Sequence, residues 1–574
     1  MSYTHNERAE YRDNALEAQE EFVETQKEFV KLFGASGLSV LAAACGSDDD
    51  DNPNPNPVVD DANDYYKIIG QSKSRGWKHL SIWAERDPND VNVWMNYGTS
   101  GGQPLSVLRT LSRYHKTNAE NPAGPWDFKV SVADARGYAA ASMFGCLPQE
   151  FVFTFNTTDG MCRIVSGIQW QSGDVVLITN NEHSGGLGPL YHAWDRYNLK
   201  VFEVNVPTGI SKGPGTGGYV EAEDGGELVA RFEAARIAAG GTVKAIMISS
   251  PPYTLGWRLQ EKQLCEWAYK HGIISIIDAA HIPGAQPVNL HDMGCDFFAG
   301  TAAKWQCAPG QTGWAYIRQG KAGDPTSSSF NSGSFTSSAW TNTMGIPDFF
   351  INATGYTHFA SSKGYQGKWK LADDIGGSIT GEYGVGNPNW PTIRICHDVN
   401  KVWQQIGRSA IAKYDQSLSQ YLRQMLANSP QGGEYTLGVD YRTPKGVIPT
   451  GAQNHKWGDF PVMLQTGLTS FRPWGVNKDY NDAVVDWQKE VDTQVAAMNR
   501  LQYEYGIRVR NSDCKQQLRA TPELCGRSVD TNGTALPVAE RTTSRPFRVS
   551  THLYTTVEEV ERCVKGLENI LAGN

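Results

Sequence analysis

The sequence predicts an α/β protein with a mainly parallel β-sheet, and three observations support this fold class. From about residue 135, short apolar runs alternate with segments of helical spacing. The apolar runs are continuous, which is typical of strands that are covered on both faces of a parallel sheet. The chain has 574 residues, of which 40% are apolar and 20% charged, so it is long enough for a large core and several domains.

Five strand candidates each follow a helix candidate along this part of the chain. The pairs are YAAASMFG with EFVFTF, DGMCRIVSGIQW with DVVLITN, LGPLYHAWDRYN with KVFEVNV, ELVARFEAARIAAG with VKAIMISS, and EKQLCEWAYKHG with IISIIDAA. Strands that are joined through helices pair in parallel, because the helix carries the chain back to the edge of the sheet where the previous strand began. We therefore assign residues 131–390 to one large domain.

The segments on either side of the large domain predict a second, smaller one. Residues 391–574 contain strand-like runs set among helices, including the final VEEVERCVKGLENILAG, which favours an α+β domain. Residues 65–130 form the N-terminal part of this small domain in our interpretation. Residues 320–390 are rich in Gly, Ser, Thr and Asn and predict long loops, which cover a site or contact another subunit.

The N-terminal residues are predicted to stand apart from the folded body. An apolar run ends at Cys45 within residues 1–46, and an acidic, Asn/Pro-rich linker at 47–64 predicts a disordered tether. This arrangement resembles a bacterial lipoprotein signal, which predicts export to the periplasm and a lipid anchor on Cys45. Gln26 and Lys27 stand where a twin-arginine signal has two arginines, and the leader is acidic. An N-terminal helical segment of a cytoplasmic protein is therefore the alternative.

Composition and cysteine spacing argue against several classes of function. The net charge of −9 gives no basic field for nucleic acid, and no charge-free apolar stretch reaches the roughly 18–20 residues of a membrane-spanning helix. The ten cysteines are scattered without CxxC pairs or zinc-like Cys/His spacing, so no metal site is predicted. The body of the protein is expected to be soluble.

Polar side chains follow three of the predicted strands, at the point where each strand ends. NTTDG follows FVFTF, NEHSGG with His183 follows DVVLITN, and IISIID ends on Asp278, with His281 close behind. A second apolar run ends on Lys304. The carboxyl ends of parallel strands form the crevice in which ligands bind, and hydroxyls with free N–H groups at the start of a helix suit a phosphate.

Pyridoxal 5'-phosphate (PLP) needs all of these groups together. It requires an amine that holds its aldehyde as a Schiff base, an anion beside its pyridine nitrogen, a phosphate cradle, and a flat group against its ring. Lys304 would supply the amine and Asp278 the anion. The apolar setting CDFFAGTAAKW would lower the pKa of Lys304 by partial desolvation. The sequence therefore predicts PLP as the cofactor.

The stretch DAAHIPGAQPVNLHDMGCDFFAGTAAKWQCAPGQTGWAYIR is similar to the class V aminotransferase superfamily of PLP enzymes, particularly its isopenicillin N epimerase-like and cysteine desulfurase-like members. The matching pattern consists of Asp278, His281, Lys304 and the apolar strand in GWAYIR. The resemblance extends from about WMNYGTSGGQP to FRVSTHLYTTVEEVERCVKGL. It implies PLP fold type I, with a seven-stranded type of sheet in the large domain, and a homodimer that builds its sites at the subunit interface.

The resemblance also implies how individual residues would bind the cofactor. Thr158 and Asp159 in NTTDGM would border the phosphate, and Thr301 takes the place of the family's phosphate-binding serine. His183 would stack on the ring, and His281 would hydrogen-bond the ring's phenolic oxygen. We expect catalysis to depend on Lys304, Asp278 and His183.

On the substrate side, the resemblance implies two contacts and shows two departures. Arg510 in GIRVRNSD falls where the desulfurases keep an arginine that grips a substrate carboxylate, and Asn96 resembles the asparagine of the N-terminal substrate loop. Ala303 replaces the histidine that precedes the family's lysine. Cys514 stands one position earlier than the desulfurase nucleophile and lacks the two histidines before it, which argues against persulfide chemistry.

These inferences favour an enzyme that acts at Cα of an amino-acid substrate, most concretely a lyase that catalyses β-elimination or C–S cleavage. An amino-acid epimerase and an aminotransferase on the same scaffold are the alternatives. Each key residue taken singly also fits a common structural role: a surface lysine for Lys304, a helix cap for Asp278 and a loop histidine for His183. The PLP hypothesis depends on their convergence in one crevice.

Two readings from other classes stay open. GTSGG, residues 98–102, fits the G-x-S-x-G pattern, so Ser100 is a candidate nucleophile of a serine hydrolase. A hydrolase would leave the NTTDG turn and Lys304 without a role. A catalytically inactive binding protein on the PLP scaffold is the third reading, because the histidine expected at 303 is missing.

Overall fold

The computed structural model describes most of the region from 93 to 318 and several later segments. The described residues are 93–122, 135–318 without 169, 180, 205–225, 241, 255 and 257, then 389–428, 466–471, 487–511 and 547–573. The predicted leader and linker at 1–64, nearly all of the predicted loops at 320–390, and both Cys45 and Cys514 lie outside the described residues.

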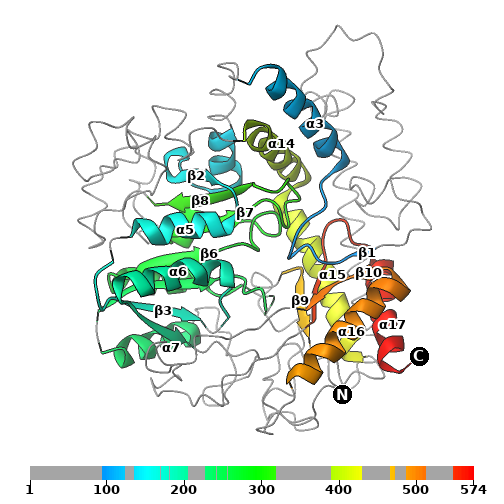
Figure 1. Ribbon diagram of the computed structural model, residues 1–574. Helices are drawn as coiled ribbons and strands as arrows, with labels where there is room; N and C mark the ends of the chain where they lie inside the picture. The colour runs from blue at the N-terminus through cyan, green and yellow to red at the C-terminus, as the bar shows by residue number, and fades with distance from the viewer. Residues whose placement is uncertain are drawn as a thin grey trace.

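A seven-stranded sheet forms the centre of the larger part of the molecule (Figure 1). Its strands, in spatial order, are β2 (Phe151–Thr154), β8 (Gly313–Ile317), β7 (Phe297–Thr301), β6 (Ile274–Asp278), β5 (Val243–Ser249), β3 (Val175–Thr179) and β4 (Lys200–Val204). All neighbours from β7 to β4 pair in parallel, whereas β8 runs antiparallel to both β7 and β2. The predicted α/β fold with a mainly parallel sheet is confirmed.

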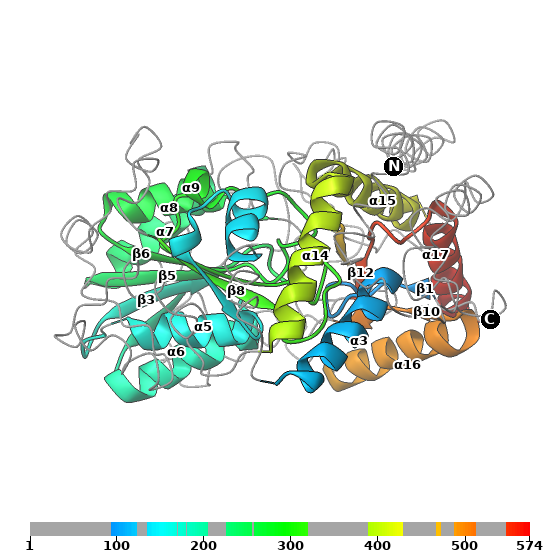
Figure 2. The ribbon, with the colours of Figure 1, turned by 90° about the horizontal axis from the view of Figure 1, so that it is seen from above.

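Helices cover both faces of this sheet (Figure 2). One face carries α5 (Thr157–Gly167) and α6 (Ser184–Tyr197), and the other carries α7 (Gly226–Ala238), α8 (Glu261–Lys270) and the short α9 (Leu290–Met293). The strands show why their sequences are continuously apolar. In β3, Val175 and Leu177 belong to one buried cluster and Val176 and Ile178 to the other, because alternate side chains point to opposite faces.

The second part of the molecule is built on a three-stranded antiparallel sheet, ordered β11 (Arg510–Asn511), β12 (Phe547–Ser550) and β9 (Leu468–Phe471). The helices α15 (Arg408–Asn428), α16 (Trp487–Tyr505) and α17 (Val557–Leu571) lie beside it (Figure 1). The start of the described chain joins this part, since β1 (Val93–Trp94) pairs in parallel with β10 (Ile507–Arg508). Segments far apart in sequence therefore meet here.

Four further helical segments complete the described helices. The helix α14 (Trp390–Ile406) lies beside α3 (Leu105–Glu120) in both views (Figures 1 and 2). After α3, the chain passes through η3 (Ala140–Phe144), a π-helix, and η4 (Pro148–Glu150), a 3-10 helix, before it enters the sheet at β2. Among the described helices, none has the length and apolar character to cross a bilayer.

Candidate active site

Asp278 and Lys304 lie at neighbouring strand ends of the parallel sheet. Asp278 is the last residue of β6 and is 3% exposed, and Lys304 follows the end of β7 by three residues and is half-buried. Burial raises the pKa of Asp278, while the positive charge of Lys304 acts to lower it. The two charges therefore interact within a single site.

The pKa of Lys304 is lowered to about 8, mainly by burial and then by the positive charge of Arg548. Asp278 acts in the opposite direction, and Arg510 adds a smaller lowering effect. A lysine with a pKa near 8 has a substantial neutral fraction at neutral to mildly basic pH, whereas an ordinary lysine is almost wholly charged. This amine can therefore act as a nucleophile or as a base.

One oxygen of Asp278 is left open. Its Oδ1 accepts a hydrogen bond from the backbone N–H of Ala280 at 3.2 Å, and no described residue donates to Oδ2. A side chain on Gly186, in the first turn of α6, would place its Cβ 3.0 Å from this Oδ2. The glycine keeps space beside a buried carboxylate oxygen, which suits a cationic N–H donor such as a protonated pyridine nitrogen.

His183 caps the start of α6 and is held as a neutral ring. Its Nδ1 accepts a hydrogen bond from the backbone N–H of Gly185 at 2.9 Å. The pKa of His183 is lowered to about 4, mainly by burial and then by the charges of Lys304, Arg548 and Arg510. An imidazole that is neutral and fixed at its base provides a flat surface without adding a positive charge.

A buried acidic residue, Glu182, lies next to His183 and was not among the predicted site residues. Glu182 accepts hydrogen bonds from Thr179 Oγ1 at 2.5 Å and from Ser249 Oγ at 2.6 Å, and the backbone N–H of His183 reaches Ser249 Oγ at 3.4 Å. Burial raises the pKa of Glu182 to about 8. The acidic residue in NEHSGG was the available signal, and its partner Ser249 could be known only from the pairing of strands.

His281 is oriented by a tryptophan that follows Lys304 in sequence. Trp305 Nε1 donates a hydrogen bond to His281 Nδ1 at 3.1 Å. Burial lowers the pKa of His281 well below its usual range, so the ring is neutral and its proton lies on Nε2. The available group is therefore a hydrogen-bond donor, as a contact with a phenolic oxygen requires.

The predicted phosphate-binding residues occupy the start of α5 and the end of β7. Thr158 is exposed, and its Oγ1 would lie 2.6 Å from a Cβ on Gly185, so α5 and α6 begin beside one another. The backbone N–H of Asp159 already bonds to Asn156 Oδ1 at 2.9 Å. The Thr301 hydroxyl donates to Thr312 O at 2.8 Å and accepts from the Ala303 N–H. Thr158 is thus the open hydroxyl of this set.

The N-terminal loop passes directly over the backbone of Lys304. The backbone N–H of Gly101 donates to the Ala303 carbonyl at 2.9 Å, and a Cβ on Gly101 would lie 2.1 Å from the Lys304 carbonyl oxygen. Asn96, in the same loop, accepts a hydrogen bond from Thr99 Oγ1 at 2.8 Å. Ser100 is exposed, and within the described residues no hydrogen bond joins its hydroxyl to a histidine or carboxylate. Nothing in this loop supports the hydrolase reading.

A buried arginine that the sequence analysis did not select faces this site. Arg548 on β12 is 3% exposed and donates from Nη2 to Thr99 Oγ1 at 2.6 Å. The predicted Arg510 is instead exposed and donates from Nη1 to the same Thr99 oxygen at 3.2 Å. Burial and then Arg510 lower the pKa of Arg548 to about 9. The signal in the sequence was a single arginine within the apolar strand FRVS.

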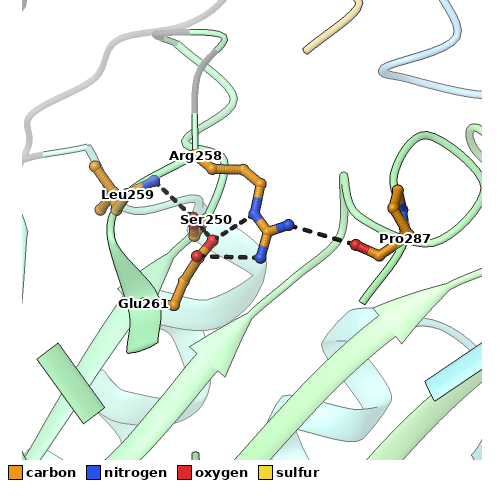
Figure 3. Close-up of polar contacts among 5 residues, drawn as sticks. All are labelled: Ser250, Arg258, Leu259, Glu261 and Pro287. Atoms are coloured by element: carbon orange, nitrogen blue, oxygen red, sulfur yellow. Dashed lines mark hydrogen bonds and ion pairs between the residues drawn. The ribbon is translucent and has the colours of Figure 1, made fainter. Parts of the chain in front are cut away.

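An ion pair joins the end of the loop after β5 to the first residue of α8 (Figure 3). Arg258 binds both oxygens of Glu261 at 3.0 and 3.1 Å, and Ser250 Oγ donates to the same carboxylate while accepting from the Leu259 N–H. The loop carries Tyr253, whose ring meets His183 edge-on with centroids 5.0 Å apart. The cluster therefore ties together the two ends of the loop that carries Tyr253.

The chain is similar in sequence to one protein-family model and to several known enzymes. A family model described as Aminotransferase class-V matches residues 220–342. The isopenicillin N epimerase of Streptomyces clavuligerus is 26% identical over 243 residues, which are 41% of this chain and 55% of the epimerase. The hercynylcysteine sulfoxide lyase of Schizosaccharomyces pombe is 26% identical over 245 residues, which are 42% of this chain and 56% of the lyase.

The solved apo structure of cysteine desulfurase from Thermococcus onnurineus NA1 is similar in fold. Its TM-score is 0.55 at 18% identity, and the match covers 85% of this chain and 99% of the desulfurase. In sequence, by contrast, the chain spans about half the length of the curated relatives that it matches. The similarity in fold extends well beyond the segment of detectable sequence similarity.

Proposed function

The chain is a relative of the class V aminotransferase superfamily, as its sequence predicted, and on this premise we propose that it is a PLP-dependent enzyme acting at Cα of an amino acid. The match to this family also confirms the cofactor prediction, PLP. The observation that carries the proposal is the pairing of Lys304 with Asp278 at the carboxyl ends of β6 and β7. A half-buried amine of lowered pKa that interacts with a buried carboxylate matches the needs of a PLP ring at both ends.

The described residues fit the cofactor at five points. Lys304 would hold its aldehyde carbon, and the open Oδ2 of Asp278 would accept a hydrogen bond from its pyridine nitrogen. His183 would lie against the ring, and the neutral His281 would donate to the phenolic oxygen. Thr158 and the start of α5 would bind the phosphate, since the N-terminus of a helix favours anions.

When bound, PLP supplies an aldehyde for amines and a ring that withdraws the electrons released at Cα. The protein's part is to move the proton and to orient the substrate. Lys304, with a pKa of about 8, has a substantial neutral fraction at pH 8 and would be the base that takes the Cα proton. Asp278 would place a negative charge beside the ring nitrogen, and Arg548 would bind the substrate's α-carboxylate beside Asn96.

We assign the reaction to the lyase class, β-elimination or C–S cleavage, with epimerisation as the second candidate. The sulfoxide lyase named among the relatives supports the first assignment, and the isopenicillin N epimerase supports the second. A panel of L- and D-amino acids separates them. A lyase releases pyruvate and ammonia, with sulfide from a sulfur-bearing substrate, whereas an epimerase changes only the chirality of the substrate.

The test of the cofactor proposal is spectroscopic. The purified protein should show the visible absorbance of lysine-bound PLP, and borohydride should abolish it and label Lys304 covalently. Lys304→Ala should lack the band, whereas Lys262→Ala, which removes an exposed lysine paired with Asp292, should keep it. A wild-type protein that stays colourless after incubation with PLP would refute the proposal.

We propose two further properties, a homodimeric state and export with a lipid anchor. The homodimer rests on the resemblance to class V enzymes, and sedimentation of the holoenzyme would reveal a monomer if it is wrong. Export with a lipid on Cys45 rests on the sequence alone. An intact Met1 on protein isolated from its native host would exclude cleavage at this site.

A further inference from the structure

We propose that the amino-acid substrate carries a second anionic group on its side chain, which Arg510 binds while Arg548 binds the α-carboxylate. The inference rests on the proposed function and adds the class of substrate. The favoured substrates are amino acids with an oxyanion, such as a carboxylate or a sulfinate, a short distance from Cα.

The geometry places the two arginines as a pair. Arg510 on β11 lies directly opposite Arg548 on the antiparallel strand β12, and opposite residues of such strands project to the same face. Both guanidinium groups converge on a single atom, since Arg510 Nη1 and Arg548 Nη2 donate to Thr99 Oγ1 at 3.2 and 2.6 Å. Two forked donors therefore border the same small region.

No acid within the described residues balances this pair. Neither guanidinium forms an ion pair with a carboxylate there, and Arg548 Nε is buried without a hydrogen-bond partner. Like charges placed opposite one another in a sheet destabilise it, and a buried charge without a counter-ion is costly. A ligand that brings negative charge to both groups would relieve this repulsion.

The charges of the pair reach the reacting side of the site. Both arginines, together with Lys304, act to lower the pKa of His183, so their charges reach the His183 ring. The cofactor phosphate has its own expected cradle at Thr158 and the start of α5. A bidentate contact with one guanidinium engages both oxygens of an α-carboxylate, so a bidentate contact with the second guanidinium requires a second anionic group.

Burial decides which arginine binds which group. Arg548 is 3% exposed and lies beside Asn96, which suits the α-carboxylate that every amino-acid substrate carries at a fixed place. Arg510 is exposed on the edge strand of its sheet, which suits a group at the outer end of a side chain. Its contribution to affinity should be smaller and should decrease as salt is added, because exposed ion pairs are screened.

The experiment uses the holoenzyme and pairs of ligands that differ only in the side-chain charge. We would compare L-aspartate with L-asparagine, and L-cysteine sulfinate with L-cysteine, measuring dissociation constants from the change in the visible spectrum. A thermal-shift comparison of succinate with butyrate adds a readout that needs no reaction. The acidic ligand of each pair should bind on the order of tenfold more tightly, as a partly exposed charged hydrogen bond allows.

The variant Arg510→Gln should remove most of this preference and leave the neutral ligands nearly unchanged. Arg113→Gln removes a positive charge from the exposed face of α3 and should keep the preference. Equal binding of acidic and neutral ligands by the wild type, or an equal loss of both in Arg510→Gln, would overturn the inference and leave the proposed function intact. A protein without the visible band would instead overturn the proposed function, and the inference with it.

Discussion

At the end of the parallel sheet the protein sets opposite charges against one another, Asp278 and Lys304, whereas at the β11–β12 edge it sets two like charges side by side, Arg510 and Arg548. The first pair is compensated within the protein. The second pair has no described acid as a partner and so depends on a ligand. Under the proposed function, the first pair would hold the cofactor and the second would bind the anionic groups of each substrate.

One residue from each pair also changes the pKa of Lys304, and the two changes have opposite directions. Asp278 raises the pKa of the amine and Arg548 lowers it, with burial as the larger lowering effect. An anionic substrate that covers Arg548 would weaken this lowering effect and raise the lysine's proton affinity as the substrate arrives. Arg548 would therefore adjust the pKa of Lys304, the base that the end of β7 positions.

The largest expected effect is that of Asp278→Asn, which removes the charge on the sheet side and nearly preserves its shape. We expect kcat/KM to fall by on the order of 100- to 1,000-fold, because the electrostatic support of the ring nitrogen is lost. The visible band should persist, since Lys304 is unchanged. Asp292→Asn, at an exposed carboxylate paired with Lys262, is the control and should retain full activity.

Arg548→Gln tests the pair of like charges at the β11–β12 edge. Loss of a buried, charged hydrogen-bond donor should raise KM by about 10- to 100-fold, with a smaller change in kcat. The matched control is Arg113→Gln, which changes net charge equally but far from the site. If kcat fell and KM stayed constant, Arg548 would not be the residue that binds the substrate carboxylate.

The pH dependence of Lys304 sharpens the comparison further. Its folded pKa, about 8, lies below the usual value for lysine, so the neutral amine accumulates as pH rises towards 8. In protein prepared without cofactor, the rate of borohydride-trapped reaction with an aldehyde should rise about tenfold per pH unit and level off near pH 8. Asp278→Asn should move this midpoint down, and Arg548→Gln should move it up. Shifts in the same direction would contradict the opposed action of the two sides.

The smallest effect is expected from Trp305→Phe, which keeps the aromatic packing but removes the donor to His281 Nδ1. The imidazole could then adopt its other tautomer, so kcat/KM should decrease by about tenfold. Trp403→Phe is a matched control, because it removes a buried indole hydrogen bond to the Gly284 carbonyl instead. Equal losses in both variants would attribute the effect to packing and not to the tautomer.

The sequence alone was sufficient for the parallel sheet and for the residues at its carboxyl ends. Runs such as DVVLITN and IISIID are continuously apolar because both faces of each strand are buried, as the division of β3 between two clusters shows. Once the strands are parallel, their order along the chain brings His183, Asp278 and Lys304 to one edge. No distant contact had to be known.

Only the tertiary structure decided which arginine is buried, which partner orients His281, and what lies behind His183. Arg510 and Arg548 stand in strands of two and four residues, too short for a reliable alternation, and their facing depends on the β11–β12 register. The Trp305–His281 bond and the Ser249–Glu182 bond join different strand ends across the sheet. Such contacts are set by the packing of segments that are remote in sequence, and a local pattern carries no information about them.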